Sequence, residues 1–211
     1  MIAFLGGTFD PIHLGHVHAA RAVLERAPVR EVRLVLAARP GHRSPPVASI
    51  ADRWAMLTAA LAGEARLVAD DCEVARSGVS FTVETLEALR ALHGAAARLA
   101  WVIGWDAYLG LPTWHRFAEL PALAHLIVVR RPGDHAAAPA ALAPFEARRV
   151  GVGALADRPA GGVAVLEAPM LAIASSEVRA RCGRGEPVAH LLSPAVWTYI
   201  TEHRLYGVSR P

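Results

Sequence analysis

The fold of this chain is predicted by one stretch near its start, Gly6-Gly7-Thr8-Phe9-Asp10-Pro11-Ile12-His13-Leu14-Gly15-His16. The stretch separates a short apolar run, Ile2–Leu5, from a pattern that predicts a helix over Gly15–Arg26. The two glycines permit unusual backbone angles and let a ligand approach the main chain closely. A strand that turns through glycines into a helix is typical of the first unit of an α/β sheet, where ligands bind beyond the carboxyl ends of the strands.

Short apolar runs alternate with longer helical patterns along the rest of the chain. Strands are predicted over Ile2–Leu5, Val32–Leu36, Arg66–Ala69, Leu99–Ile103, Leu126–Val129 and Val163–Leu166. Helices are predicted over Gly15–Arg26, Ala51–Ala62, Thr82–Leu92, Trp114–Leu120, Ser176–Cys182 and Pro194–Glu202. Because most of the strand candidates are apolar on both faces, we expect a doubly wound, mainly parallel α/β sheet with helices on both faces.

The length suits one domain, 1–211, with residues 176–206 expected as a C-terminal helical portion packed on it. The composition is 54% hydrophobic and 19% charged, which excludes a disordered chain. All 22 basic residues are arginine, and this excludes a Walker A loop, which requires lysine. The net charge of +3 is modest and the arginines are scattered, so we expect a small anionic substrate rather than nucleic acid.

Cysteine usage and hydropathy indicate a cytoplasmic protein. Cys72 and Cys182 are far apart and lack metal-type spacing, so they are interpreted as free thiols. No apolar run is long enough to span a membrane, and the first residues lack the features of a signal peptide.

Two histidines give the first stretch its chemistry. His13 and His16 are three residues apart, which places them on one face at the start of the predicted helix. The helix dipole and the free N–H groups there favour anions, and imidazoles can stabilise charge that develops during phosphoryl transfer. A strand–turn–helix junction with incidental polar residues is the structural alternative. A zinc site built on His13, His16 and His18 is the metal-binding alternative.

The string Gly-Gly-Thr-Phe-Asp-Pro-x-His-x-Gly-His resembles the signature of the nucleotidyltransferase superfamily with the His-x-Gly-His motif. Those enzymes join a nucleoside triphosphate to a phosphate-bearing partner and release pyrophosphate. The resemblance implies a Rossmann-like fold. It also implies that His13 and His16 contact the triphosphate, with His16 as the main catalytic group.

Later segments resemble one branch of that superfamily, the bacterial nicotinate mononucleotide adenylyltransferases. The matching segments run in order along almost the whole chain: Pro40–Arg43 with Arg53, Ser80–Leu86, Ile103–Asp106 with Leu111–Trp114, Arg130–Gly133, Ile173–Arg179, Tyr199–Ile200 and Leu205–Tyr206. Trp105, His115 and Ala174 depart from the pattern of the family.

The resemblance implies transfer of AMP from ATP to nicotinate mononucleotide, with nicotinate adenine dinucleotide and pyrophosphate as products of a step in NAD biosynthesis. For ATP it implies a site made of Gly6, Gly7, Thr8, Phe9, Asp10, Gly104, Ser175, Ser176 and Arg179. For the mononucleotide it implies His42, Thr82, Thr85, Asp106, Trp114 and Arg131. Magnesium (Mg2+) is expected on the ATP phosphates, with few direct protein ligands.

Three alternatives to this function stay open. The same chemistry can act on another acceptor: nicotinamide mononucleotide, pantetheine phosphate or a phosphorylated alcohol. The chain can also be a non-catalytic nucleotide-binding module. The third alternative is a metal-dependent hydrolase that uses the histidine cluster.

Overall fold

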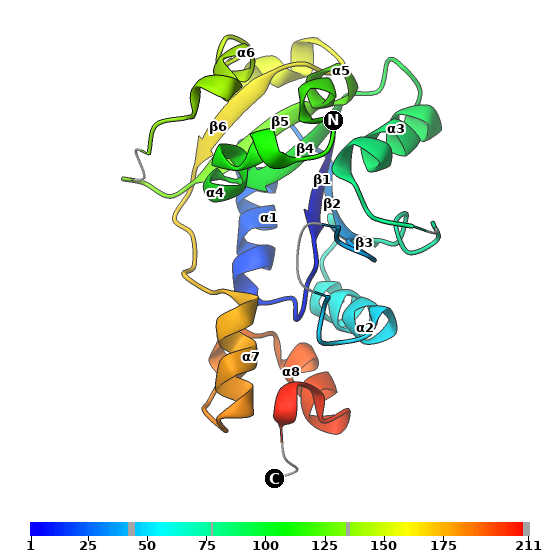
Figure 1. Ribbon diagram of the computed structural model, residues 1–211, viewed down its shortest axis with the longest axis vertical. Coiled ribbons are helices and arrows are strands. Elements are labelled where there is room, and N and C mark those ends of the chain that lie inside the picture. Colours follow the sequence, from blue (N-terminus) through cyan, green and yellow to red (C-terminus); the bar gives the residue numbers. More distant parts are fainter. Residues whose placement is uncertain (42–44, 77, 134–135, 209–211) are drawn as a thin grey trace.

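The computed structural model describes residues 1–41, 45–76, 78–133 and 136–208, and its centre is one six-stranded sheet (Figure 1). The strands are β1 (Ile2–Gly7), β2 (Glu31–Leu36), β3 (Leu67–Asp70), β4 (Leu99–Gly104), β5 (His125–Arg130) and β6 (Val163–Glu167). All neighbours pair in parallel, in the order β3-β2-β1-β4-β5-β6. The predicted sheet and each of its six predicted strands are confirmed.

The strand order reverses at the centre of the sheet. β1 pairs with β2 on one side and with β4 on the other, and successive connections then build outward in opposite directions. Connections that diverge from adjacent strands leave a crevice beyond their carboxyl ends. The loop after β1 and the start of the helix after β4 therefore meet at the position where an open α/β sheet binds ligands.

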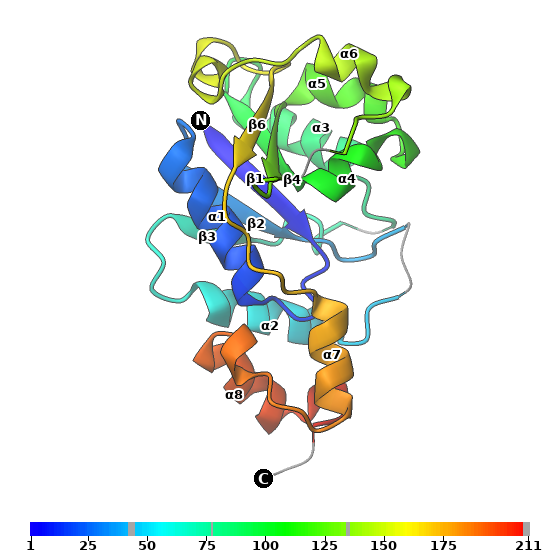
Figure 2. The ribbon, with the colours of Figure 1, turned by 90° about the vertical axis from the view of Figure 1, so that its left-hand side faces the viewer.

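Helices cover both faces of the sheet (Figures 1 and 2). The α-helices are α1 (Leu14–Arg26), α2 (Ile50–Leu61), α3 (Thr82–His93), α4 (Trp105–Leu109), α5 (Leu120–Leu123), α6 (Ala143–Glu146), α7 (Ser175–Gly183) and α8 (Pro194–Glu202). Short 3-10 segments are η1 (Leu111–Thr113), η2 (Phe117–Glu119), η3 (Ala140–Leu142), η4 (Val152–Asp157), η5 (Ala189–Leu191) and η6 (Leu205–Gly207).

Side chains that alternate along the strands pack in two hydrophobic cores, one on each face of the sheet. Ala100 and Val102 of β4 pack in the core that contains residues of α1, α2 and α8. Leu99 and Trp101 of the same strand pack in the core that contains residues of α3, α4, α5 and α6. Burial on both faces explains why the strands are apolar at nearly every position.

The predicted helix over Trp114–Leu120 is wrong. Trp114 has an extended backbone, with φ −78° and ψ 144°, between η1 and η2. Arg116 then adopts a left-handed conformation, with φ 52°, and the α-helix starts only at Leu120. The apolar residues of this segment are spaced like a helix, but a left-handed residue in the middle interrupts any continuous helical turn.

The C-terminal helices lie beyond the carboxyl ends of the strands rather than against a face of the sheet (Figure 2). α8 packs on α2, and the Tyr199 hydroxyl donates to Asp52 Oδ1 at 3.1 Å. α7 lies beside the loop that follows β1, which brings the end of the chain to the ligand edge (Figures 1 and 2). None of the helices in the described ranges combines the length and apolar composition that a membrane span requires.

Candidate active site

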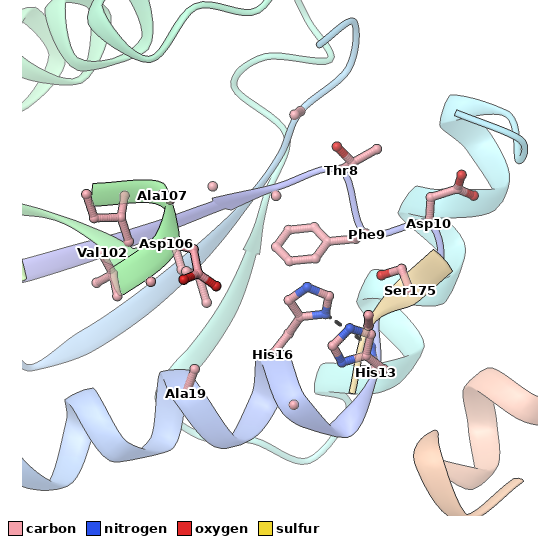
Figure 3. A pocket seen from close by; sticks show the side chains of 18 of the residues that line it. Thr8, Phe9, Asp10, His13, His16, Ala19, Val102, Asp106, Ala107 and Ser175 are labelled. Atoms are coloured by element: carbon pink, nitrogen blue, oxygen red, sulfur yellow. Dashed lines mark hydrogen bonds between the residues drawn. The ribbon is translucent and has the colours of Figure 1, made fainter. Parts of the chain in front are cut away.

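A cavity of about 1220 Å³ opens at the reversal point between β1 and β4. Its walls come from the loop after β1, the first turn of α1, the ends of β4 and β5, α4, the loop around Ser80 and the start of α7. Figure 3 shows how side chains from the loop after β1, α1, β4, α4 and α7 converge on it. Most residues that the sequence predicted for the site lie on this single cavity: Gly6, Gly7, Thr8, Phe9, Asp10, His13, His16, Thr82, Gly104, Asp106, Trp114, Arg131, Ser175, Ser176 and Arg179.

The two histidines stack at the start of α1. Their ring centroids are 3.7 Å apart and the rings are inclined by 22°. His13 is the N-cap residue of α1, and its backbone N–H donates to His16 Nδ1 at 3.3 Å (the dashed line in Figure 3). The Phe9 ring meets His16 edge-on at 5.0 Å. These contacts place the His16 ring beside the open amide groups at the helix N-terminus, where an anion is stabilised.

His13 is the more buried histidine, with 6% of its surface exposed. Its Nδ1 atom is buried and has no hydrogen-bond partner in the described part of the chain. Burial lowers the pKa of His13 from 6.5 to about 4, because a charged imidazolium loses its hydration there. His13 is therefore neutral at physiological pH.

Gly15 makes room for the stacked pair. A Cβ atom at this position would lie 3.0 Å from His13 Nδ1 and 3.1 Å from His13 Cε1. Real Cβ atoms rarely approach so closely, so a side chain at residue 15 would displace the His13 ring. The glycine of the His-x-Gly-His motif thus lets the first histidine keep this position.

The Asp10 carboxylate is used to hold the loop together. Only 3% of the Asp10 surface is exposed. Its oxygens accept hydrogen bonds from the backbone N–H groups of Val47 at 2.8 Å and Ala48 at 3.1 Å, and from the Tyr206 hydroxyl at 2.8 Å. Asp10 lies on the wall of the cavity, but its carboxylate fixes the geometry of the loop.

Arg53 also holds the loop after β1 in place, through a hydrogen bond to the carbonyl oxygen of Thr8. Its side chain is 1% exposed and donates to the carbonyl oxygens of Thr8, Ala37, Ala38 and Ala48 at 2.8 to 3.3 Å. A buried guanidinium is tolerated when its donors are satisfied. Arg53 thereby ties the ends of β1 and β2 to the start of α2.

The start of α7 forms the wall opposite α1. Ser175 is its first residue, and the Ser175 hydroxyl donates to the carbonyl oxygen of Pro11 at 3.0 Å. Arg179 Nη1 donates to the carbonyl oxygen of Asp10 at 2.6 Å and keeps about a third of its side chain exposed to the cavity side. The N-termini of two helices, α1 and α7, therefore face one cavity that also contains a guanidinium.

The predicted acceptor residues separate into two groups. Thr82, Asp106, Trp114 and Arg131 line the cavity, and Asp106 and Arg131 are exposed to it. Thr85 does not line it: Thr85 is fully buried, and its hydroxyl donates to Glu73 Oε1 at 2.6 Å and accepts from Arg76 Nη2 at 2.7 Å. The predicted residue His42 lies outside the described residues.

Glu73 is a cavity residue that the sequence did not indicate. It is 5% exposed, and burial raises the pKa of its carboxyl group. No motif marked it, because a single glutamate between apolar residues looks like any surface position. Its bond to Thr85 shows that the polar residues of the Ser80–Leu86 segment partly serve to anchor that segment.

The three departures from the family pattern have distinct environments. Trp105 is 5% exposed, and the Arg130 guanidinium lies 5.0 Å from its ring centroid. His115 packs on Phe81 with ring centroids 4.5 Å apart. Ala174 is the N-cap residue of α7 and lines the cavity, so the wall has a methyl group where the family pattern has a hydroxyl.

The described residues contain no group of three or more histidine, cysteine, aspartate or glutamate side chains that could hold a metal ion. Among the described residues, the arginines on the cavity are Arg131 and Arg179. The arrangement therefore offers helix N-termini, imidazoles and guanidinium groups to an anion rather than a protein-built metal cage.

Comparisons with known proteins agree with this geometry. Residues 4–181 match the model of the cytidylyltransferase-like family. A protein of Pseudomonas fluorescens named "Probable nicotinate-nucleotide adenylyltransferase" is 42% identical over 206 residues, which cover 97% of this chain and 96% of the relative. A protein of the same name from Pseudomonas aeruginosa is 40% identical over 97% of this chain and 96% of its own length.

A solved structure shares the fold. The nicotinic acid mononucleotide adenylyltransferase of Plasmodium falciparum in complex with NaAD superposes with a TM-score of 0.74, at 19% identity, over 99% of this chain and 98% of that one. The doubly wound, Rossmann-like nucleotidyltransferase fold that the sequence predicted is therefore confirmed. By the family model, and by relatives at about 40% identity along almost its whole length, this chain belongs to the nicotinate-nucleotide adenylyltransferases of the cytidylyltransferase-like family.

Proposed function

We propose that the protein transfers AMP from ATP to nicotinate mononucleotide, forming nicotinate adenine dinucleotide and pyrophosphate. One observation carries the proposal: the stacked pair His13 and His16 at the start of α1 faces the start of α7 across a single cavity at the reversal point of the sheet. The relatives at 40 to 42% identity carry the name of this activity, which supports the choice of acceptor.

The reaction requires positioning and charge stabilisation rather than a protein nucleophile. An oxygen of the mononucleotide phosphate attacks the α-phosphorus of ATP in line, and the bond from that phosphorus to the bridging oxygen of the β-phosphate breaks. The attacking group is already anionic, so no side chain needs to remove a proton from it. Catalysis then depends on donors aimed at the oxygens where negative charge develops.

The walls of the cavity divide this work. We assign His16 to the α-phosphate, since its ring is held in place by His13 and Phe9 beside the N-terminus of α1. Ser175, Ser176 and Arg179 would hold the other phosphates from α7, and His13, Gly6, Gly7, Thr8 and Gly104 would line the approach of the triphosphate. A neutral His13 fits this role as a hydrogen-bonding partner and as the surface on which the His16 ring packs.

The opposite end of the cavity would hold the acceptor. Trp114 offers a flat aromatic surface for a pyridine ring, Asp106 an acceptor for ribose hydroxyls, and Arg131 a guanidinium for the phosphate. Thr82 lines the same end, whereas Thr85 would act through its bond to Glu73.

Magnesium would enter with ATP. It would neutralise phosphate oxygens and keep several of its waters, so it would need few protein ligands. Among the cavity carboxylates, Asp106 is exposed and could bind a metal-bound water, while Asp10 and Glu73 are buried.

We also propose that the chain acts as one domain, residues 1–211, with residues 176–206 as a C-terminal helical portion packed on it. The contacts of Tyr206 and Arg179 with Asp10 support this, since they join the C-terminal segment to the first loop. A single cooperative unfolding transition, seen at the same temperature by circular dichroism and by tryptophan fluorescence, would support it. Two separate transitions would contradict it.

The function is tested by supplying ATP and Mg2+ with each mononucleotide in turn and measuring pyrophosphate release. We expect turnover with nicotinate mononucleotide to exceed turnover with nicotinamide mononucleotide. His16→Ala should reduce kcat by roughly 10²–10³, as loss of one transition-state donor does.

His18→Ala is the matched control, because His18 lies on the same helix but bonds the carbonyl oxygen of Pro169 outside the cavity. Preference for the amide, or full turnover by His16→Ala, would refute the assignment.

A further inference from the structure

The last turn of the described chain contacts the loop that carries the two histidines. The Tyr206 hydroxyl donates to Asp10 Oδ1 at 2.8 Å, although the two residues are 196 positions apart. Tyr206 is 9% exposed and Asp10 is 3% exposed. Tyr206 is not among the residues that line the cavity.

Asp10, which accepts this hydrogen bond, also contacts a cationic side chain of the cavity. Its Oδ2 atom lies 3.7 Å from Arg179 Nη1, and the same nitrogen donates to the Asp10 carbonyl oxygen at 2.6 Å. Arg179 itself lines the cavity. A buried carboxylate with fixed partners therefore connects the Tyr206 hydroxyl to a guanidinium that lines the cavity.

The backbone of the turn is held in an uncommon conformation. Arg204 has φ 53° and Tyr206 has φ 58°, both in the left-handed region that non-glycine residues enter at an energetic cost. Such angles persist only where surrounding contacts fix them. A Cβ atom on Gly207 would lie 3.4 Å from Gly183 Cα, so the turn also lies directly against the end of α7.

These contacts fix α7 at both ends. Its start is held by the Ser175 and Arg179 bonds to the backbone of Pro11 and Asp10, and its end is held by the turn around Tyr206. The Tyr206 hydroxyl thus bonds the residue, Asp10, at which the loop after β1 and α7 meet.

We propose that Tyr206 is a positioning residue for nucleotidyl transfer, which acts through Asp10 on Arg179 and on the His13–His16 loop. The proposal rests on the proposed function for the reaction it serves, but the contacts on which it is based do not. It predicts that loss of one remote hydroxyl changes how ATP is held and how fast it reacts.

The experiment compares Tyr206→Phe with Tyr199→Phe. Both variants remove one tyrosine hydroxyl that donates to an aspartate from the same C-terminal segment, but Asp52, the partner of Tyr199, does not line the cavity. In steady-state assays we expect Tyr206→Phe to lower kcat by roughly tenfold to a hundredfold, since small displacements of reacting groups have effects of this size. The KM for ATP should rise severalfold, and the KM for the mononucleotide should stay within about twofold.

Tyr199→Phe should leave all three constants within about twofold of the wild type. Equal losses of kcat in the two variants would overturn the proposal, because they would show that the loss comes from disturbed packing of the C-terminal segment. Wild-type kcat in Tyr206→Phe would overturn it as well.

A second measurement tests the route through Arg179 and does not depend on turnover. Binding of a non-hydrolysable ATP analogue is measured by calorimetry for Tyr206→Phe, Arg179→Lys and the double variant. If Tyr206 acts through Arg179, the double variant loses less affinity than the product of the two single losses. Simple multiplication of the two losses would refute this route.

The two proposals can fail separately. If the wild type releases no pyrophosphate with either mononucleotide, the proposed function fails, whereas weaker binding of the ATP analogue by Tyr206→Phe alone would still support its positioning role. If the wild type turns over and Tyr206→Phe matches it in kcat and in binding, only the inference about Tyr206 fails.

Discussion

Acidification should destabilise the protein through His13. The pKa of this buried histidine is about 4, whereas the ordinary value that it regains in the unfolded chain is 6.5. Between these values the unfolded state binds a proton that the folded state does not. The free energy of unfolding therefore increases with pH in this window and falls as the pH decreases through it.

The magnitude follows from the size of the shift. Each pKa unit corresponds to about 1.36 kcal/mol, so a shift from 6.5 to about 4 gives a loss of about 3 kcal/mol at pH 4 relative to pH 7. The steepest part lies near pH 5, where His13 contributes a slope of about 1 kcal/mol per pH unit. This is a large share of the stability of a typical domain, which is about 5–15 kcal/mol.

Urea denaturation between pH 4 and pH 7 measures this contribution if the wild type is compared with His13→Asn. Other groups titrate in the same range, and Glu73, with its raised pKa, acts in the opposite sense because its contribution falls as the pH rises. These groups are common to both proteins, so the difference between the two profiles isolates His13. The expected result is a shallower pH dependence in His13→Asn by about 1 kcal/mol per pH unit near pH 5. Parallel profiles would refute the argument that His13 is buried in its neutral form.

Three further changes test the supports of the cavity. Gly15→Ala should lower kcat by at least about tenfold, because the new methyl group displaces the His13 ring. The melting temperature should change little, because the higher helix propensity of alanine offsets the cost of that displacement. An unchanged kcat would contradict the close approach of residue 15 to His13. Arg53→Met should lower the free energy of unfolding by about 3–5 kcal/mol, since it removes the donors of four carbonyl oxygens, two of them in buried hydrogen bonds. A loss below about 1 kcal/mol in urea denaturation would argue against their importance. Glu73→Gln keeps an acceptor for the Thr85 hydroxyl and removes a buried carboxyl group, so kcat should stay within about threefold of the wild type. The free energy of unfolding should no longer fall with rising pH through this group. A hundredfold loss of kcat would show that the charge of Glu73 takes part in the reaction.

The sequence predicted the parts of the fold that depend on periodicity and burial. All six strands could be located because burial on both faces makes them continuously apolar, and the start of α1 could be located because it follows a glycine turn. The segment around Trp114 could not be predicted in this way. Its apolar residues are spaced like a helix, and their spacing gives no sign of the left-handed Arg116 that interrupts it.

The sequence also predicted which residues line the cavity better than it predicted what they do. His13, His16, Ser175 and Arg179 lie together because the chain direction at the sheet edge brings motif residues to one place. The partners that hold them could not be found from local patterns. Tyr206 meets Asp10 only after 196 residues have folded between them, and no spacing rule spans such a distance.

Asp10 shows why a motif residue need not contact the substrate. A free carboxylate beside a triphosphate would repel it, yet this one is on the wall of the cavity. Partners within the protein offset the charge of this carboxylate. Two backbone N–H groups and the Tyr206 hydroxyl donate to it, and Arg179 Nη1 lies 3.7 Å from Asp10 Oδ2. An acidic residue that is fully engaged in this way can orient the Arg179 guanidinium, which lines the cavity. In the string after β1, two stacked histidines therefore line the cavity, and a buried carboxylate holds the loop around them in place.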